Sequence, residues 1–386
     1  IDNIRRAQSL YTQARDADPG FALARARLAL MHTLSAATYD TSLARREQAR
    51  LEAEAALRLR PGLSEAHEAL AEYWDLGGNL AQAIEEIRLA IEGFPNSGDL
   101  RQTLGNMLAR AGRLDDAVAE FDQAVRLEPG SPKAAFAAAV FHLRLRRDEK
   151  AMQGFDRALV LAPDYHMVKV IKGHTYLRWK GTPDTLAAAM KTVPPDWDPD
   201  GMATWARYTA LWAQRRYADA LEMLDRSGAE LSRDGLVYQP MPLMRARLYD
   251  TMGERGKARS SYLTAMDLLE DSVASRPGDA SMRIALGLAY AGLGRSVEAA
   301  REARKAMELV PLASNTPAAT AFMGGAVEVF ARAGQTDAAL ELLELLFSMP
   351  AGREVTRAFL RVWPGFDRLR QDPRLEELVR RYATAG

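Results

Sequence analysis

The sequence predicts an all-α protein in which antiparallel helix pairs stack one on the next along the chain. Two observations predict this fold: an apolar pattern recurs every 34 residues, and a proline ends each copy. The clearest copies contain Ala83, Ile87, Ala90 and Pro95, then Ala117, Phe121, Ala124 and Pro129, then Ala151, Phe155, Ala158 and Pro163. Small residues let two helices approach, a larger apolar residue fills the space between them, and proline stops the helix. These segments are therefore predicted to be the second helices of three consecutive pairs.

The first helix of a pair carries glycine at a packing position. Gly105 lies in "TLGNML" and Gly287 in "ALGLAYAGLG", where Tyr290 follows one turn later. A glycine inside a helix costs ~1 kcal/mol relative to alanine, so close packing has to compensate. The stretches "RAGRLDDA" and "GLGRSVEA" hold the turn residues between the first helix and the second.

The period and the small residues resemble the tetratricopeptide repeat. The resemblance implies a right-handed superhelical solenoid, and the same phase extends over nearly the whole chain. It is found at Ala7, Tyr11, Ala14 and Pro19, at Ala49, Ala53, Ala56 and Pro61, and then at Gly173, Tyr176, Tyr217, Ala220, Tyr249, Ala258, Tyr262, Ala265, Ala299, Ala306, Pro311, Ala339, Leu343 and Leu346.

The spacing departs from the period at several stretches, with further excess residues in "MDLLEDSVASRPGD" and "PLASNTPAATAF". Pro19 and Pro61 are 42 residues apart, so longer helices or an extended turn are expected between them. The segment "TPDTLAAAMKTVPPDWDPDG" is short for a helix pair, and we expect an irregular joint near residues 180–200. The joint would separate an N-terminal stack at 1–195 from a C-terminal stack at 196–350, and whether it is a hinge is left open.

Residues 351–386 abandon the repeat pattern and are expected to form a helical cap. A terminal cap covers an apolar face of the last repeat while its charged side faces water. The side chains expected to pack are Trp363, Phe366, Leu369, Leu375 and Leu378.

Composition limits the possible function. Lysine plus arginine equals aspartate plus glutamate, 51 against 51, so no overall field draws the chain to nucleic acid or an anionic membrane. The absence of cysteine excludes disulfides, thiolate zinc sites and cysteine nucleophiles. No apolar run is long enough to span a bilayer, and nothing resembles a signal peptide. We expect a soluble domain without membrane insertion; the cytoplasm is favoured, and the outer side of a membrane-anchored regulator is the alternative.

The sequence begins at Ile1 within a helical pattern, so a piece of a longer protein is expected. Residues 1–18 supply only the second helix of a pair, and upstream chain, a partner or a second copy in a homodimer would cover its apolar face. The stretches "YTQARDADPGFALARARLALMH" and "FDRLRQDPRLEELVRRY" resemble the C-terminal repeat regions of bacterial multidomain regulators. Those regulators carry a winged-helix, nucleotide cyclase or Ser/Thr kinase effector upstream, which implies a regulatory or partner-binding module here.

The stretch "PPDWDPDG" invites a metal-site interpretation, because Asp196, Asp198, Asp200 and Gly201 match the first half of a calcium loop. A full loop needs an oxygen ligand at its twelfth position, and that position is Arg207. We therefore favour a joint followed by a helix start, with Asp200 near the helix amino terminus, where negative charge suits the helix dipole. No metal site is expected.

No catalytic or cofactor site is expected either, and any enzyme activity would lie upstream of Ile1. The histidines are scattered along the chain, at His32, His67, His142, His166 and His174. "HEAL" lacks the second histidine of a zinc-protease helix, and the glycines of "AGLGR" follow a helix, not the strand that a dinucleotide loop requires.

The candidate site is the concave face that the resemblance assigns to the first helices of the pairs. The residues predicted to line this groove are Asn106, Arg110, Phe136, Val140, Arg144, Met167, His174, Arg178, Trp205 and Trp212. The three arginines are 34 residues apart and would form a ladder beside an apolar floor. Arginine can hold a carboxylate through two parallel hydrogen bonds, so a carboxylate-bearing protein or peptide is the expected partner. In the alternative interpretation, the arginines complement helix dipoles and the aromatic residues are core.

The leading hypothesis is a non-catalytic scaffold that binds a protein or peptide. A self-association domain of a signalling enzyme or transcription regulator is the alternative, and a helical-repeat RNA reader is a third. Zero net charge and an acidic helix face at Glu65, Glu68, Glu72 and Asp75 count against RNA, because phosphate contacts require a basic track.

Overall fold

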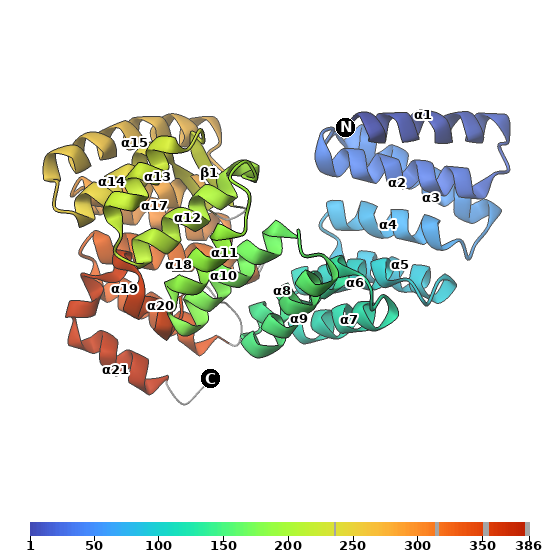
Figure 1. Ribbon diagram of the computed structural model, residues 1–386. Coiled ribbons are helices and arrows are strands. Elements are labelled where there is room, and N and C mark those ends of the chain that lie inside the picture. The colour runs from blue at the N-terminus through green and yellow to red at the C-terminus, as the bar shows by residue number, and fades with distance from the viewer. Residues whose placement is uncertain (235–236, 313–315, 350–354, 383–386) are drawn as a thin grey trace. The chain divides into compact units, whose positions relative to one another are not determined.

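The computed structural model describes residues 1–234, 237–312, 316–349 and 355–382, and the fold is all-α, as predicted. Within these residues it contains 21 α-helices, joined by short loops, and two short strands (Figure 1). The chain divides into two compact units, Ile1–Phe141 and His142–Gly386, and the division falls within α8 (Pro132–Arg144).

The first unit is a run of helix pairs. Its helices are α1 (Asp2–Ala17), α2 (Ala22–Thr38), α3 (Leu43–Leu59), α4 (Ser64–Leu76), α5 (Leu80–Gly93), α6 (Gly98–Arg110), α7 (Leu114–Leu127) and most of α8. The helices α2 and α3 have 17 residues each, whereas α4 and α5 have 13 and 14, so longer helices account for the wide spacing between Pro19 and Pro61. The helix α1 has no buried side chain, and the predicted homodimer through it stays a prediction.

The second unit continues the pairing. Its helices are α9 (Asp148–Leu161), α10 (His166–Lys180), α11 (Pro183–Lys191), α12 (Met202–Ala213), α13 (Tyr217–Arg226), α14 (Met241–Thr251), α15 (Arg255–Ser275), α16 (Ala280–Gly292), α17 (Ser296–Leu309), α18 (Thr316–Arg332), α19 (Thr336–Ser348), α20 (Arg357–Val362) and α21 (Pro373–Arg381). Three short 3-10 turns lie at Pro199–Gly201, Pro364–Phe366 and Leu369–Gln371.

The residues that define the repeat are buried as predicted. The alanines at 83, 90, 117, 124, 151 and 158 are fully buried, and so is Phe155. Gly105 shows why glycine is needed in the first helix: a Cβ atom there would lie 2.8 Å from Cε2 of Phe121. The ring of Phe121 is 1% exposed and stacks on Phe141, with centroids 4.1 Å apart. The repeat pattern therefore encodes the packing inside and between neighbouring pairs.

A small β-hairpin is an addition that the repeat pattern did not predict. The strands β1 (Leu231–Asp234) and β2 (Val237–Pro240) pair antiparallel, with Leu231 opposite Pro240, between α13 and α14. A search for helical periodicity does not detect so short a pair of strands.

The predicted joint near 180–200 contains a short helix and a turn. The helix α11 has nine residues, and Gly201 adopts a left-handed backbone with φ of 73° just before α12. Leu186 and Met190 on one side and Trp205 on the other belong to the same hydrophobic core. The predicted boundary at 195/196 thus lies inside the second compact unit, and the three-part division into 1–195, 196–350 and 351–386 stays a prediction.

The C-terminal segment packs into the second unit more extensively than a cap on the last pair would. Trp363, Phe366, Leu369, Leu375 and Leu378 all join the main core of that unit. The helix α21 packs on α19, whereas α20 packs on α10, which lies near the beginning of the unit. Residues 350–354 and 383–386, which include both ends of the predicted cap, lie outside the described residues.

Candidate functional site

We use the term inner face for the surface formed by the first helices of the pairs within one unit. In the second unit these helices are α10, α12, α14, α16 and α18. The segment 355–371, which we call the return segment, lies on this surface, because its residues line one small cavity of about 120 Å³ together with residues of all five helices. The inner face of the second unit is therefore already in contact with a segment of the same chain.

A buried ion pair holds the middle of the return segment. The guanidinium of Arg247, which is 1% exposed, donates to the carboxylate of Glu328. The indole Nε1 of Trp363 donates to Oε2 of Glu328 over 3.1 Å. Trp363 also meets Trp212 edge to face, with centroids 4.6 Å apart, and Cζ of Arg247 lies 4.3 Å from the Trp212 ring. Removing two charges from water costs free energy, which offsets much of the attraction within a buried ion pair. The main effect of these hydrogen bonds is therefore to specify which side chains contact one another at this position.

Further aromatic contacts surround this pair. Phe359 stacks on Trp363 with centroids 4.9 Å apart, and Phe366 is 1% exposed. Gly365 lies so close to the ion pair that a Cβ atom there would clash with the carboxylate of Glu328. The return segment is thus held by aromatic rings that pack between the helices. Its backbone also lies close to Glu328, which is possible because residue 365 is a glycine.

Polar contacts fix the two ends of the return segment. The hydroxyl of Thr356 donates to the backbone carbonyl of Arg178 at the end of α10. Arg215, in the turn after α12, forms two hydrogen bonds with the carboxylate of Asp367, at 2.5 and 2.8 Å. A paired arginine and carboxylate in this arrangement adds orientation as well as attraction.

The structure brings three of the predicted groove residues to the return segment. Trp212 is fully buried and lies in the core against Trp363. Trp205 is 8% exposed and lines the small cavity beside the segment. The guanidinium carbon of Arg178 lies 6.0 Å from the ring centroid of Phe359. In this conformation all three residues face the chain's own C-terminal segment.

The other predicted residues of the second unit are half-buried. They are Arg144, Met167 and His174. Nε2 of His174 lies 3.0 Å from Oγ1 of Thr209, which is a hydrogen-bond distance between two neighbouring first helices. The histidine therefore has a structural partner, consistent with the alternative interpretation of the scattered histidines.

In the first unit the predicted residues remain on the surface. Asn106 and Arg110 are exposed, and Phe136 and Val140 are half-buried. The guanidinium of Arg110 donates to the carboxylate of Asp75 on α4, so this arginine already has an acidic partner. Because Arg110 belongs to the first unit and Arg144 and Arg178 to the second, the continuous ladder of three arginines stays a prediction.

The inner face of the first unit is acidic along α4. Glu65 pairs with Arg27 at 3.2 Å, one turn before Glu68 and two turns before Glu72. Burial, together with the neighbouring carboxylates of Asp75 and Glu68, raises the pKa of Glu72 to about 7, against the opposing effect of Arg110. Burial also raises the pKa of Glu68. This surface thus holds more carboxylate than guanidinium.

The stretch "PPDWDPDG" leads into the start of α12, as the preferred interpretation predicted, with Asp200 just before the helix and Asp198 as its capping residue. One carboxylate oxygen of Asp198 accepts the backbone N–H groups of Ala203 and Thr204, at 2.7 and 3.0 Å. Its other oxygen accepts the hydroxyl of Thr204 at 2.6 Å. Arg207 donates to the carbonyls of residues 193 and 194, so a cation holds the turn.

Two other histidines have partners that explain them structurally. Burial, together with nearby Arg45, lowers the pKa of His32 to about 4. His67 lies 2.8 Å from a carboxylate oxygen of Glu86, which raises its pKa. Across the described ranges no group of three or more histidine, aspartate or glutamate side chains is arranged to hold a metal ion.

Sequence reasoning missed Arg215, Arg247 and Glu328, which bind the return segment, and Asp367 within the segment itself. One signal was available. The turns after the first helices carry glycine at 78 and 112, and adding the period of 34 gives Arg146, where the structure again has a positive φ. The sequence could therefore have shown that an arginine occupies a turn position where the other repeats have glycine. Arg215, which also has a positive φ, is the second arginine of this kind.

Comparison with known proteins supports the repeat assignment. Residues 103–166 match the tetratricopeptide repeat family model, and no curated protein matches the chain. A tetratricopeptide repeat protein from Parabacteroides merdae is 16% identical and has a TM-score of 0.48, covering 64% of this chain and 93% of its own. The structure of YrrB, described as a TPR protein with an unusual peptide-binding site, is 18% identical with a TM-score of 0.38, covering 51% and 97%. A human IFIT1 dimer with PPP-AAAA is 14% identical with a TM-score of 0.41, covering 80% and 68%.

These TM-scores are all below 0.5. Among the described residues no helix has both the length and the apolar character to cross a bilayer.

The segment 103–166, which matches the family model, contains two of the copies that show the 34-residue period and the buried alanines. The chain therefore contains tetratricopeptide repeats.

Proposed function

We propose that this chain is a non-catalytic scaffold that binds a protein or peptide segment on the inner face of its helix pairs, as a module of a bacterial regulatory protein. The return segment is the observation that carries the proposal. Within the second unit, a stretch without the repeat pattern is held on the first helices by Phe359, Trp363 and Phe366 and by the polar contacts around Glu328. An inner face of this kind thus has the chemistry to hold a peptide segment with aromatic anchors.

The first unit offers the surface for a partner in trans. Its predicted residues Asn106 and Arg110 are exposed, beside the half-buried side chains of Phe136 and Val140. These residues supply a polar rim and apolar contacts, which is the usual composition of a peptide-binding surface.

The charge of this surface selects the partner. Arg110 pairs with Asp75, and Glu68 and Glu72 lie on the same helix with raised pKa values. A partner with a lysine or arginine beside an apolar residue would relieve the carboxylate repulsion. We therefore propose that the partner of the first unit is a basic peptide segment. The carboxylate-bearing partner expected from the arginine ladder could bind Arg110 only if the ion pair between Arg110 and Asp75 were broken.

A matched pair of double variants tests this proposal. Peptides are selected from a display library against the full chain, and their affinities are measured by calorimetric titration. The variant E68Q/E72Q removes two inner-face charges from α4. The control E85Q/E92Q makes the same chemical change on α5, the second helix of the same pair, where both side chains are exposed.

We expect the inner-face variant to bind the selected basic peptides about tenfold more weakly, which corresponds to about 1.4 kcal/mol, and the control to bind them like the parent. Equal affinities for the parent and E68Q/E72Q would contradict the proposal, and so would equal losses in the two variants. The regulatory setting is tested separately, by whether the gene product carries an effector domain before Ile1.

A further inference from the structure

The inner face of the first unit carries two neighbouring rows of side chains with different chemistry. On α4, carboxylates recur at intervals of three and four residues, which places them on one side of the helix. We call these residues the acidic row: Glu65, Glu68, Glu72 and Asp75.

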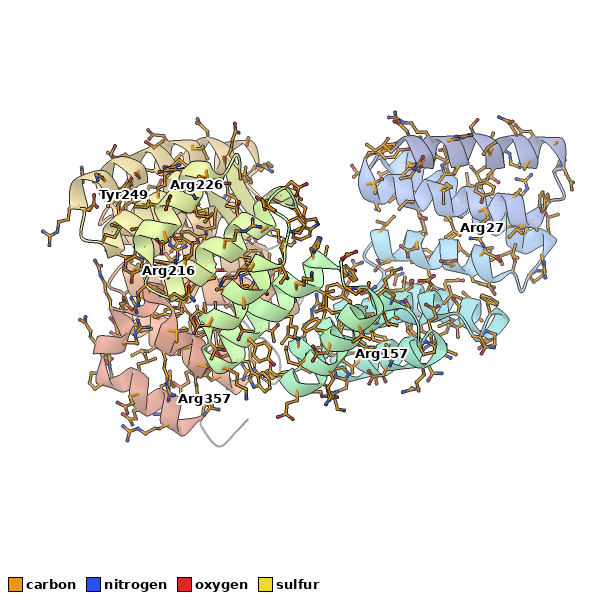
Figure 2. All side chains as sticks on the ribbon, in the orientation of Figure 1. Arg27, Arg157, Arg216, Arg226, Tyr249 and Arg357 are labelled. Carbon is orange, nitrogen blue, oxygen red and sulfur yellow. The ribbon has the colours of Figure 1, made fainter. Side chains whose placement is uncertain are left out.

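Leucines follow a helical spacing along α2, the first helix of the preceding pair. Leu23 and Leu34 are 36% and 42% exposed, and Leu30 between them is half-buried; we call these three residues the leucine row. Arg27, which Figure 2 labels, lies between the first two of them in sequence. Its Nη2 lies 3.2 Å from Oε1 of Glu65, and α2 packs against α4. The two rows are therefore neighbours, and each runs along its own helix.

The middle of the acidic row has no cationic partner from the chain. Arginines pair with the carboxylates at its two ends, Glu65 and Asp75. Among the residues that the structure describes, none forms a hydrogen bond or ion pair with Glu68 or Glu72, and burial raises the pKa of both. Cations from a partner would thus meet two carboxylates that are one helical turn apart.

The next first helix, α6, places a buried amide beside Glu68. Side chains 34 positions apart on consecutive first helices lie next to each other, as the ion pair between Asp99 and Lys133 shows. Gln102 follows Glu68 by 34 positions and is 7% exposed, and its Nε2 has no hydrogen-bond partner among the described residues. A buried amide without a partner costs free energy, which a polar side chain of a bound segment would recover.

The arrangement of the two rows favours a helical partner. A strand that lies along α4 turns successive side chains to opposite sides, so it presents one row to the surface. A helix presents two neighbouring rows on the same side. Its rise of about 5.4 Å per turn equals that of α2 and α4, so its side chains stay in register with both rows. An extended segment that crosses the helices would contact each row at a single position.

We propose that the partner of the first unit is a basic amphipathic helix that lies along α2 and α4, with lysine or arginine towards the acidic row and apolar side chains towards the leucine row. This inference rests on the proposed binding of a basic peptide by the first unit, and it adds the conformation of the partner and a second contact surface. Apolar anchors at one-turn intervals are typical of a helix bound in a groove, and complementary charge fixes its register.

Three designed peptides of equal length and equal net charge test the conformation. The first has lysines at one-turn intervals on one side of a helix and leucines on the neighbouring side. The second has the same composition, with lysine and leucine in strict alternation, which is a strand pattern. The third is the first peptide with two central alanines replaced by proline, which breaks the helix. Calorimetric titration of the full chain measures each affinity, and circular dichroism measures the helix content of each mixture.

We expect the helical peptide to bind at least tenfold more tightly than either of the other two and to gain helix content on binding. Equal affinities for the helical and the proline peptide overturn the inference, whereas a loss of basic-peptide binding in E68Q/E72Q would still support the proposed function. No binding of the helical peptide also overturns the inference, and the peptides selected from the library then decide the proposed function separately.

A second pair of double variants tests the leucine row. The variant L23S/L34S removes the two exposed leucines from α2. The matched control L43S/L51S makes the same change on α3, the second helix of that pair, where the two leucines are 75% and 50% exposed. Circular dichroism and the melting temperature show that each variant is folded.

We expect L23S/L34S to bind the helical peptide at least tenfold more weakly, and L43S/L51S to bind it like the parent. If folded L23S/L34S binds the helical peptide with the parent's affinity, the leucine row is not part of the site and the inference is wrong. An equal loss in L43S/L51S would show that the affinity reports general surface hydrophobicity, and it would overturn the inference as well.

Discussion

Replacing Trp363 with alanine tests whether the return segment belongs to the core of the second unit. The Trp363 side chain is 4% exposed, and its indole donates to Glu328 over 3.1 Å. It also meets Trp212 and Phe359, at ring-centroid distances of 4.6 and 4.9 Å. The W363A variant removes all of these contacts together.

The expected loss of stability follows from these contacts. A buried tryptophan removes roughly 150–250 Å² from water, which at about 25 cal/mol per Å² corresponds to roughly 4–6 kcal/mol. Loss of the indole donor adds on the order of 1 kcal/mol, since Arg247 still holds Glu328. Partial collapse of the site reduces the total, so we expect the free energy of unfolding of the second unit to fall by about 4–5 kcal/mol. A domain has a total stability of only about 5–15 kcal/mol.

Urea unfolding, followed by tryptophan fluorescence, measures this loss. Trp74 is in the first unit, and the other five tryptophans, Trp363 among them, are in the second, so the signal reports mainly the second unit. Hydrogen exchange of peptides that cover 355–371 locates the effect and should show faster exchange in W363A. The W363F variant keeps a ring but removes the N–H donor, and it should lose about 1–2 kcal/mol.

The control is V297A, because Val297 is 76% exposed on α17 of the same unit and should change stability by less than about 0.5 kcal/mol. If W363A unfolds at the same urea concentration as V297A, with unchanged exchange in 355–371, then the return segment does not pack as described. The inner face of the second unit would then not hold this segment.

Three further predictions follow from other contacts. F121A should lower the stability of the first unit by about 3–5 kcal/mol in urea unfolding, because the ring is buried against the repeat glycine; a loss below about 1 kcal/mol would contradict that packing. D198A should cost about 1–2 kcal/mol in thermal unfolding, because the side chain caps α12; D198N should recover most of this loss, and equal melting temperatures for D198A and the parent would exclude the cap. For Glu72, the folded pKa of about 7 is above the ordinary value of 4.5, so the folded state binds the proton more tightly and stability falls as pH rises from about 4.5 to about 7. E72Q should remove this decline, and its free energy of unfolding at pH 8 should be about 1–2 kcal/mol higher than that of the parent. The figure is smaller than the full pKa shift would give, because the side chain is only partly buried and solvent screens its charge. Parallel pH profiles of stability for the two proteins would refute the raised pKa of Glu72.

The sequence was sufficient to assign most of the candidate site residues to helices. It was not sufficient to predict whether those residues are exposed or covered by another segment of the chain. The first helices and the exposed positions Asn106 and Arg110 agree with the repeat phase. The phase also predicted Trp212 as a groove residue, and the structure places it in the core. A period in the sequence identifies which side of a helix faces inward, whereas it contains no information on what will cover that side.

The sequence by itself determined the helix pairs, their length and their buried alanines, because each pair packs on its neighbours in the chain and the spacing of small and large residues records that local packing directly. Only the tertiary structure decided that the C-terminal residues return to α10, α12 and α18. The contacts of Thr356 with Arg178, Asp367 with Arg215, and Glu328 with Arg247 join residues that are 81 to 178 positions apart. Such contacts depend on the relative orientation of distant helix pairs. That orientation is the accumulated result of many small rotations between neighbouring pairs. A periodic sequence pattern shows which residues pack between neighbours, but it does not show the total rotation.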